Sequence, residues 1–334
     1  MNIYDVSKKA GVSIATVSRV LNGNSNVSDK TRSKVLSAMK ELDYTPNIFA
    51  RGLGLNTMKT IGIMCTDSSD TYLANAVYYV EQTLRSFGYD ALLCCTGNDY
   101  DNKRKYLSLL LSKRVDGIIL VGSQFVSSDP DIDNTYIIEA ASEMPIILVN
   151  GYLEGENIYC VMCDDRNAVY SSTAKLIESG VKKPVYLYTS TSTSGMNKLQ
   201  GFRDALSDAG ITPDKKQLHL CTKNISKAKD YLTGLYNEAF YFDAVLASDD
   251  SLAVGAVKFA YEHSVKVPDE LQIIGYNNSV LANCTEPELS SIDSKVEQLS
   301  TTAVSLLMQV LSGNSVPKLN TVTADLIKRK TTKF

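Results

Sequence analysis

The sequence contains no long apolar run and very few histidines, and each of these absences excludes a class of protein. No stretch of about 18 or more uncharged apolar residues occurs, so no membrane-spanning helix is expected. The first residues, MNIYDVSKK, lack the apolar segment of a secretory signal, which predicts a cytoplasmic protein. His219 and His263 are the only histidines and stand apart in the sequence. Because they cannot form a catalytic triad or a metal-ligand cluster, and no nucleophile-elbow motif occurs, an enzyme is not predicted.

Cysteines are present, but they do not follow the patterns of disulfide-rich or metal-binding proteins. Seven cysteines, an odd number, are scattered along the chain, which argues against a secreted disulfide framework. Cys160 and Cys163 have CxxC spacing, but no second pair accompanies them. We interpret them, and the adjacent Cys94 and Cys95, as thiols of buried strands, with metal or redox chemistry as the alternative. No metal, no other cofactor and no catalytic residue is therefore predicted.

The charge of the chain is unevenly distributed. A length of 334 residues predicts two or three compact units, and 44% hydrophobic and 21% charged residues are ordinary for a globular protein. Residues 1–59 contain nine Lys and Arg against four Asp and Glu, whereas the remaining residues contain 25 and 33. This division favours a small polyanion-binding head on an acidic body, and a solvated basic surface is the alternative.

Three short helices are predicted in the head. The first runs from Asn2 or Ile3 to Ala10 and is ended by Gly11, and the second covers residues 14–22 with Ser13 as its N-cap. A third is predicted over residues 29–42. The apolar positions at helical spacing are Val6 and Ala10, then Val17, Val20 and Leu21, then Val35, Leu36, Met39 and Leu42. One such set on three short helices makes a very small core.

The second predicted helix has mostly small side chains on its polar side. Ala15, Thr16 and Ser18 are small, and Arg19 is the single long cationic side chain. Two helices joined by a glycine-containing turn form a helix-turn-helix, whose second helix enters the DNA major groove with its N-terminal residues at base edges. Small side chains allow this approach, and Arg19 can contact guanine through two parallel hydrogen bonds. A phosphate contact or a solvated side chain is the alternative for Arg19.

The segment IYDVSKKAGVSIATVSRVLNG (3–23) resembles the headpiece of the lactose-repressor/galactose-repressor family of bacterial transcription regulators, and closely that of its catabolite-control members. The resemblance implies that Ile14, Ala15 and Arg19 read bases. It also implies a set of polar residues that grip phosphates and position the protein without reading sequence. These residues are Tyr4, Ser13, Thr16, Ser18 and Asn22.

A further short helix-like segment, YTPNIFARGL (44–53), follows the head. Pro46 suits the first position of a helix, whereas Gly52 and Gly54 lower the stability of so short a helix. The segment resembles the hinge helix of the family, which folds when two protomers lie side by side in the minor groove. By this resemblance Leu53 inserts between base pairs and kinks the duplex, and ordinary linker packing is the alternative.

Short apolar runs alternate with amphipathic stretches from Lys59 onward. This alternation predicts parallel sheets covered by helices on both faces, arranged as two similar lobes. The predicted strands cover residues 60–66, 90–95, 117–122, 145–150, 158–163, 185–190, 244–248 and 271–276. Their order resembles the effector domain of the same family, which is two-lobed like periplasmic sugar-binding proteins. The resemblance covers the whole chain and is clearest over residues 244–278.

An effector site is expected between the lobes, because ligands of open α/β sheets lie beyond the C-terminal ends of the strands. The residues that match cleft-facing positions of the family are Asp67, Tyr72, Asp165, Lys198, Asp249 and Asn277. Several departures from the family pattern occur. Lys198 stands where an Arg is usual, and Asn277 replaces an Asp. Asn224-Ile225 stands where an aromatic residue often stacks on the ligand, and Asp70-Thr71-Tyr72 lacks the usual Asn-Pro-aromatic element.

These features together predict a sequence-specific repressor that binds a near-palindromic DNA operator as a homodimer. A small effector in the interlobe cleft, a carbohydrate or its phosphate, is expected to control it. The alternatives are a non-sugar metabolite or a protein corepressor, and a solute-binding protein if the body is considered alone. No contact with a membrane is expected.

The predicted fold class is α/β, in three parts. Residues 1–45 form a three-helix helix-turn-helix head, and residues 46–58 form a hinge helix and linker. Residues 59–334 form a two-lobed, periplasmic-binding-protein-like body with two parallel sheets, for effector binding and dimerisation. The chain is expected to cross between the two lobes.

Overall fold

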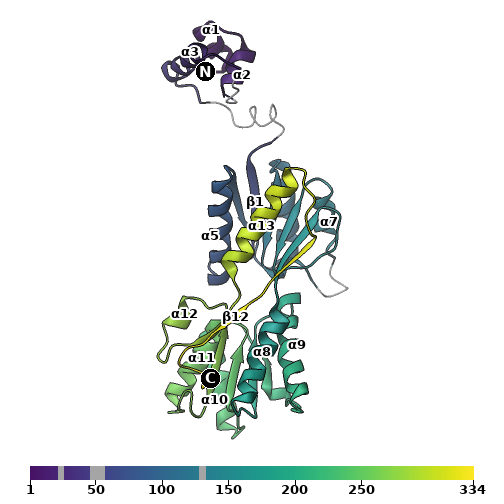
Figure 1. Ribbon diagram of the computed structural model, residues 1–334, viewed down its shortest axis with the longest axis vertical. Helices are drawn as coiled ribbons and strands as arrows, with labels where there is room; N and C mark the ends of the chain where they lie inside the picture. Colours follow the sequence, from purple (N-terminus) through teal and green to yellow (C-terminus); the bar gives the residue numbers. More distant parts are fainter. Residues whose placement is uncertain (22–25, 46–56, 128–132) are drawn as a thin grey trace. The chain divides into compact units, whose positions relative to one another are not determined.

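The computed structural model describes residues 1–21, 26–45, 57–127 and 133–334 (Figure 1). The chain divides into two compact units, residues 1–60 with 114–116 and residues 61–113 with 117–334. None of the helices in the described ranges is long and apolar enough to cross a membrane. Asn22, Leu53 and residues 46–56 of the predicted hinge lie outside the described residues.

The head contains the three predicted helices, α1 (Ile3–Ala10), α2 (Ile14–Leu21) and α3 (Asp29–Glu41). Asn2 caps α1, because its side-chain oxygen accepts from two backbone N–H groups of the first turn while the Asp5 carboxylate accepts from the Asn2 N–H. Gly11 ends α1 in the left-handed conformation, with a φ of 66°. Ser13 Oγ accepts from the Thr16 N–H at 3.2 Å, which confirms Ser13 as the N-cap of α2.

The three head helices share one small core. Its buried side chains are Val6, Val17, Val20, Val35 and Ala38. The prediction that Leu36 belongs to this core is wrong, because its side chain is 52% exposed whereas that of Ala38 is 3% exposed. Successive helical residues are rotated by about 100°, so Val35 and Ala38 face the core while Leu36 turns to solvent.

Lobe 1 of the body is a six-stranded sheet with helices on both faces. The strand order is β11-β5-β4-β3-β1-β2, and the neighbours from β11 through β1 are parallel. Helices α5 and α13 pack together on one face, and a Cβ added at Gly62 of β1 would meet Leu110 of α6, which covers the other face. The elements are β1 (Thr60–Cys65), α5 (Thr71–Ser86), β2 (Asp90–Cys95), α6 (Tyr100–Ser112), β3 (Gly117–Val121), α7 (Thr135–Ala141), β4 (Ile146–Val149), β5 (Ile158–Cys163), α13 (Val296–Leu311) and β11 (Leu319–Val322).

Lobe 2 repeats this architecture with the strand order β12-β10-β9-β8-β6-β7. Its odd-numbered strand residues, such as Val245, pack against α10 and α11, whereas even-numbered ones, such as Leu246, pack against α8 and α9. Burial on both faces explains why these strands read as continuous apolar runs. The elements are α8 (Asp165–Glu178), β6 (Pro184–Tyr188), α9 (Thr193–Asp208), β7 (Leu218–Leu220), α10 (Ile225–Asn237), β8 (Ala244–Ala247), α11 (Asp250–Glu262), β9 (Gln272–Tyr276), α12 (Val280–Asn283), β10 (Ser290–Asp293) and β12 (Asp325–Ile327).

All eight predicted strands are present, but the sequence misses four others, β7, β10, β11 and β12. These strands contain three or four residues each and are polar, as in LHL and LNTV, so they carry no apolar run. The sheet of lobe 2 also departs from a purely parallel arrangement, because β12 pairs with β10 in antiparallel fashion.

The chain passes from one lobe to the other at three places in the described residues. It enters lobe 2 between β5 and α8, returns to lobe 1 between β10 and α13, and enters lobe 2 again between β11 and β12. Figure 1 shows α13 on lobe 1 and β12 on lobe 2, with the C-terminal part of the chain passing from the first lobe to the second. The two lobes are therefore connected by three segments of chain.

Candidate functional site

The solvent-facing side of α2 carries mostly small side chains. Ile14, Ala15 and Arg19 are all exposed, whereas Val17 and Val20 on the opposite face are buried in the core of the head. The turn before α2 is held by Ser7, whose Oγ donates to the Val12 carbonyl oxygen at 2.6 Å. These contacts hold the N-terminal end of α2 so that its small side chains and Arg19 face solvent together.

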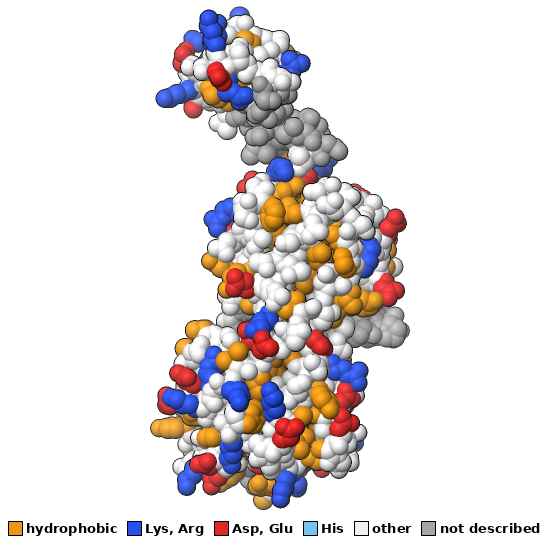
Figure 2. Space-filling view, in the orientation of Figure 1, with side chains coloured by type: hydrophobic (Ala, Val, Ile, Leu, Met, Phe, Trp, Pro, Cys, Tyr) orange, Lys and Arg blue, Asp and Glu red, His pale blue; other side chains and the backbone are white. Residues whose placement is uncertain are grey.

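The polar residues predicted to contact phosphates surround this face. Tyr4 on α1 and Ser13 before α2 are exposed, and Thr16 and Ser18 are half-buried on α2. Ser13 Oγ and Thr16 Oγ1 lie 2.9 Å apart in a hydrogen bond. The space-filling view shows several Lys and Arg side chains on the drawn face of the head (Figure 2). The surface of the head is therefore suited to a polyanion.

A cleft of about 750 Å³ lies between the two lobes of the body. Its lining comes from loops at the C-terminal ends of strands in both sheets, where ligands of open α/β sheets bind. The lining is mostly hydroxyl, amide and carboxylate groups, and Tyr72 is its single aromatic side chain. Residues that directly follow strands include Thr66, Gly122 and Asn150 of lobe 1 and Thr189, Ser248 and Asn277 of lobe 2.

Five of the six predicted effector residues line this cleft, namely Asp67, Tyr72, Lys198, Asp249 and Asn277. The Tyr72 hydroxyl accepts from Asn150 Nδ2 at 2.5 Å, and burial raises the pKa of Tyr72 well above its ordinary value. Asn277 Nδ2 donates to Asp249 Oδ2 at 3.0 Å. An Asp at position 277 could not make this contact as a donor, so the departure from the family pattern fits its neighbour.

Asp165 does not line the cleft. It is 2% exposed and accepts hydrogen bonds from Tyr276 Oη and Ser194 Oγ, both at 2.5 Å. Its Oδ1 lies 3.8 Å from Lys198 Nζ, which also sits 3.7 Å from the centre of the Tyr276 ring. Asp165 therefore lies behind Lys198 and Ser194, which both line the cleft.

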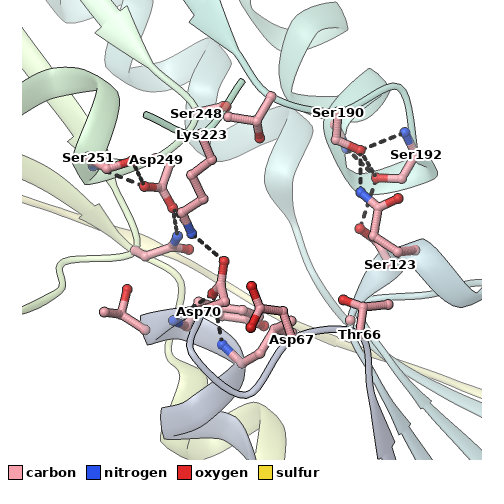
Figure 3. Close-up of a pocket in the computed structure, with 18 of the residues that line it drawn as sticks. Thr66, Asp67, Asp70, Ser123, Ser190, Ser192, Lys223, Ser248, Asp249 and Ser251 are labelled. Atoms are coloured by element: carbon pink, nitrogen blue, oxygen red, sulfur yellow. Dashed lines mark hydrogen bonds and ion pairs between the residues drawn. The ribbon is translucent and has the colours of Figure 1, made fainter. Parts of the chain in front are cut away.

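Sequence reasoning missed the charged group at the centre of the cleft. Lys223 Nζ lies 2.7 Å from Asp70 Oδ2 of lobe 1 and 2.7 Å from Asp249 Oδ2 of lobe 2 (Figure 3). Lys223 precedes the N-cap of α10, Asn224, in the loop after β7. Because the short strand β7 is not predicted, neither is the loop that brings Lys223 into the cleft.

Uncharged contacts between the lobes lie on the other side of the cleft. Ser123 Oγ of lobe 1 is 2.8 Å from Ser192 Oγ of lobe 2, and Gln124 Nε2 donates to Ser190 Oγ at 2.9 Å. Figure 3 shows this group facing the Lys223 group across the space between the lobes. The two lobes are thus joined at both sides of the cleft.

The CxxC cysteines belong to buried strand β5, as predicted. Cys160 Sγ lies 3.7 Å from the Leu153 carbonyl oxygen, and Cys163 Sγ lies 3.6 Å from Tyr276 Oη. The described residues contain no group of three or more His, Cys, Asp or Glu side chains arranged to hold a metal ion. Burial raises the pKa of Cys163 to about 12, so its thiol is uncharged at neutral pH.

One unit carries an exposed helix-turn-helix, and the other is a two-lobed α/β body with a polar cleft. This combination defines a DNA-binding regulator with a ligand-binding body. Comparison with family models agrees. Residues 2–47 match "Bacterial regulatory proteins, lacI family", and residues 58–330 match "Periplasmic binding proteins and sugar binding domain of LacI family". The chain belongs to the lacI family of bacterial regulatory proteins.

Individual relatives extend over the full chain. An HTH-type transcriptional regulator of Lachnoclostridium phytofermentans is 56% identical over 334 residues, covering 100% of both chains. Catabolite control protein A of Staphylococcus aureus is 32% identical, covering 100% of this chain and 99% of the relative. The lac repressor dimer bound to operator and the anti-inducer ONPF has the same fold, with a TM-score of 0.87, 24% identity and 99% coverage of both chains. This chain is a DNA-binding transcription regulator with a sugar-binding domain, not an enzyme.

Proposed function

We propose that this regulator is a cytoplasmic repressor that binds a near-palindromic operator as a homodimer and responds to a carbohydrate or carbohydrate phosphate in the interlobe cleft. The observation that carries the proposal is the exposed face of α2, with Ile14, Ala15 and Arg19 presented together beside exposed polar side chains. Residues 1–45 would serve as the DNA-binding head, 46–58 as the hinge with Leu53 as its wedge, and 59–334 as the effector-binding and dimerisation domain.

The chemistry of DNA contact follows from the head. The short side chains of α2 let the helix approach base edges, and the guanidinium of Arg19 can donate two hydrogen bonds to one guanine. Tyr4, Ser13, Thr16, Ser18 and Asn22 would contact phosphates and set the register. Two heads related by a two-fold axis would read two half-sites.

The dimerisation surface that we favour lies on lobe 2. Tyr261 at the end of α11 is 90% exposed, and Val280 at the start of α12 is 66% exposed. The two helices contact one another, and Val254 and Val257 of α11, each only 8% exposed, line the same surface region as Tyr261. Exposed apolar side chains gathered on adjacent helices are typical of surfaces that pair with a second copy.

Control by an effector follows from the body. The hydroxyl, amide and carboxylate groups of the cleft can donate to and accept from a polyhydroxylated ligand, and its volume suits a small molecule. A ligand that binds one lobe angle more tightly than another shifts the population of body conformations. The change would reach DNA through the segment that joins the body to the head.

The proposal is tested first by letting the full chain select DNA from a pool of randomised palindromic duplexes at fixed, near-physiological salt. The affinity for the enriched site is then measured by fluorescence-anisotropy titration. Salt is fixed because phosphate contacts alone bind DNA without specificity. Enrichment of one two-fold-symmetric site supports the repressor model, and weak, salt-sensitive binding without enrichment contradicts it. The selected duplex then reports effectors: a sugar that changes its affinity supports carbohydrate control, and a response to other metabolites or to an added protein alone contradicts it.

A further inference from the structure

The ionic group at Lys223 joins two helices of different lobes. Asp70 is the N-cap of α5 in lobe 1, and its Oδ1 accepts from two backbone N–H groups of that helix at 2.9 and 3.1 Å. Asp249 is the N-cap of α11 in lobe 2, and its Oδ1 accepts from the N–H and Oγ of Ser251 at 2.9 and 2.6 Å. The remaining oxygen of each carboxylate, Oδ2, lies 2.7 Å from the Lys223 ammonium nitrogen.

This arrangement makes the bridge rigid at both ends. Each carboxylate is held by the helix that it caps, so neither can follow Lys223 if the lobes separate. Figure 3 shows Lys223 reaching from the side of Asp249 across the cleft to Asp70. Opening the cleft therefore requires that the ammonium group leave one of its two partners.

The bridge is shielded from solvent. The side chains of Lys223, Asp70 and Asp249 are 32%, 18% and 9% exposed. Burial alone lowers the pKa of Lys223, but the charges and hydrogen bonds of Asp249 and Asp70 outweigh it, and the net shift is upward. Lys223 is thus charged at neutral pH, and salt screens a partly buried pair of this kind less than a surface pair.

The same group leaves the cleft without a cation that is free for an anionic ligand. Among the described residues that line the cleft, Lys223 and Lys198 are the cationic side chains. Lys223 has two carboxylate partners, and Lys198 lies beside Asp165. Asp67 adds a further carboxylate to the lining. A phosphate group in the cleft would face three carboxylates without an unpaired cation.

A hydrogen-bonding group without a protein partner lies next to this bridge. Ser248 Oγ is buried and makes no hydrogen bond in the structure, although Ser248 lines the cleft beside Asp249. A buried hydroxyl without a partner is costly, and a ligand hydroxyl would satisfy it.

We propose that Lys223 determines the specificity of the effector site, because its bridge between Asp70 and Asp249 holds the lobes together and reserves the cleft for uncharged, polyhydroxylated ligands. This inference rests on the proposed function only in assigning the cleft to an effector. It narrows that assignment, since it excludes phosphorylated sugars.

The role of the Lys223 bridge is tested by measuring the distance between spin labels placed on the two lobes. Cys95 on lobe 1 is exposed, so one spin label can be attached to it and a second to Tyr241→Cys on lobe 2, outside the proposed pairing surface. Both labels are placed in the full chain carrying Cys221→Ser and Cys284→Ser, with unlabelled protein added in excess. Lys223→Gln should shift or broaden the distance distribution of the labels, and Lys223→Arg, which keeps the charge, should preserve it. An unchanged distribution in Lys223→Gln overturns the bridge.

The charge selectivity is tested with inorganic phosphate as the probe. Asp70→Asn keeps an N-cap side chain on α5 but withdraws one carboxylate from Lys223. The unsubstituted chain should show no thermal shift with millimolar phosphate beyond that of an ionic-strength-matched chloride control, whereas Asp70→Asn should show a clear upward shift. Adding Lys223→Gln to Asp70→Asn should abolish that shift. Equal shifts in the unsubstituted chain and Asp70→Asn overturn the selectivity.

Both measurements are made without DNA or effector. If no sugar alters operator binding while the label distances and phosphate shifts behave as stated, the proposed effector class fails and the role of Lys223 stands. If sugars act on operator binding while Lys223→Gln changes neither the label distances nor the phosphate-induced thermal shift, the proposed effector class stands and the role of Lys223 fails.

Discussion

The Tyr276 hydroxyl donates a hydrogen bond to Asp165 Oδ1 at 2.5 Å, and the ring of the same tyrosine lies against the ammonium group of Lys198. Tyr276 ends strand β9 and Asp165 begins helix α8, so the pair joins two distant parts of lobe 2. Burial and the nearby charge of Asp165 raise the pKa of Tyr276 well above its ordinary value, which keeps the hydroxyl protonated as a donor. A position expected to contact ligand is thus occupied by a buried structural carboxylate.

Removing this carboxylate should destabilise the body. Asp165→Ala leaves Tyr276 Oη, Ser194 Oγ and Lys198 Nζ without their buried partner, and we expect a loss of about 3 kcal/mol in the free energy of unfolding, measured in urea. Glu238→Ala is the control, because its partner Lys216 is exposed and the loss should be at most about 1 kcal/mol. Equal losses would show that Asp165 has no special role.

Arg19→Ala should weaken binding to the selected operator by about 1–3 kcal/mol and relax the preference at one base pair of each half-site. The reason is the loss of a planar donor from the exposed face of α2. Tyr4→Phe on α1 is the comparison, because Tyr4 is proposed to contact phosphate and loss of its hydroxyl should lower affinity for all sequences alike. A loss of equal size on every duplex in the Arg19→Ala titration would mean that Arg19 contacts only phosphate.

The stability of lobe 2 should depend on pH through Asp250. Burial raises the pKa of Asp250 to about 6 from 3.8, although hydrogen bonds from Ser291 and Ser279 oppose the rise. The folded state therefore binds this proton more tightly than the unfolded state, and stability falls as pH rises from about 4 to about 6. The loss of unfolding free energy is absent below the pKa of Asp250 in the unfolded state. It amounts to about 3 kcal/mol above the pKa of Asp250 in the folded state.

Asp250→Asn tests this dependence, because the amide does not titrate. The difference in unfolding free energy between the unsubstituted chain and Asp250→Asn, followed in urea between pH 4 and pH 7, should change in favour of the variant as pH rises. Comparing the two proteins cancels the titration of other carboxylates. Parallel pH profiles would rule out an elevated pKa at this site.

The cysteines should divide by reactivity according to their burial. Cys95 and Cys284 are exposed, whereas Cys65, Cys160 and Cys163 are buried. Maleimide labelling of the native chain, mapped by mass spectrometry, should modify Cys95 within minutes and Cys284 more slowly, because Cys284 lies in the same surface region as Tyr261. Cys65, Cys160 and Cys163 should be spared until urea unfolds the protein. Early modification of Cys160 together with Cys163 would instead favour a reactive CxxC pair.

The proposed pairing surface is tested with two exposed tyrosines, one inside it and one outside it. Tyr261→Glu places a charge on α11 where a second copy should pack, and we expect it to raise the dissociation constant of the dimer at least tenfold in analytical ultracentrifugation. Tyr241 lies beyond α10, is 61% exposed and lies outside this surface, so Tyr241→Glu should leave the dimer intact. Identical behaviour of the two variants would exclude the surface on α11 and α12.

Local signals explain why most of the head and body could be predicted. The caps at Ser13 and Gly11 and the helical spacing of Val17 and Val20 depend on residues within a few positions of one another. Seven of the eight predicted strands are buried on both faces, which requires continuous apolar runs. The exposed edge strand β2 is predictable from its short apolar run alone. The four missed strands lack such runs, and three of them, β7, β11 and β12, lie at sheet edges, so only pairing with the rest of the sheet makes them strands.

The sequence by itself determined the three head helices, the exposed short-chained face of α2, the alternating body and five of the residues that line the cleft, because periodicity and loop position carry that information. Only the tertiary structure decided that Asp165 is buried behind Lys198 and that Lys223 links the lobes. Asp70 and Lys223 are 153 positions apart in the chain. Their charges interact because the chain crosses between the lobes and closes one sheet against the other, and no local pattern records that contact.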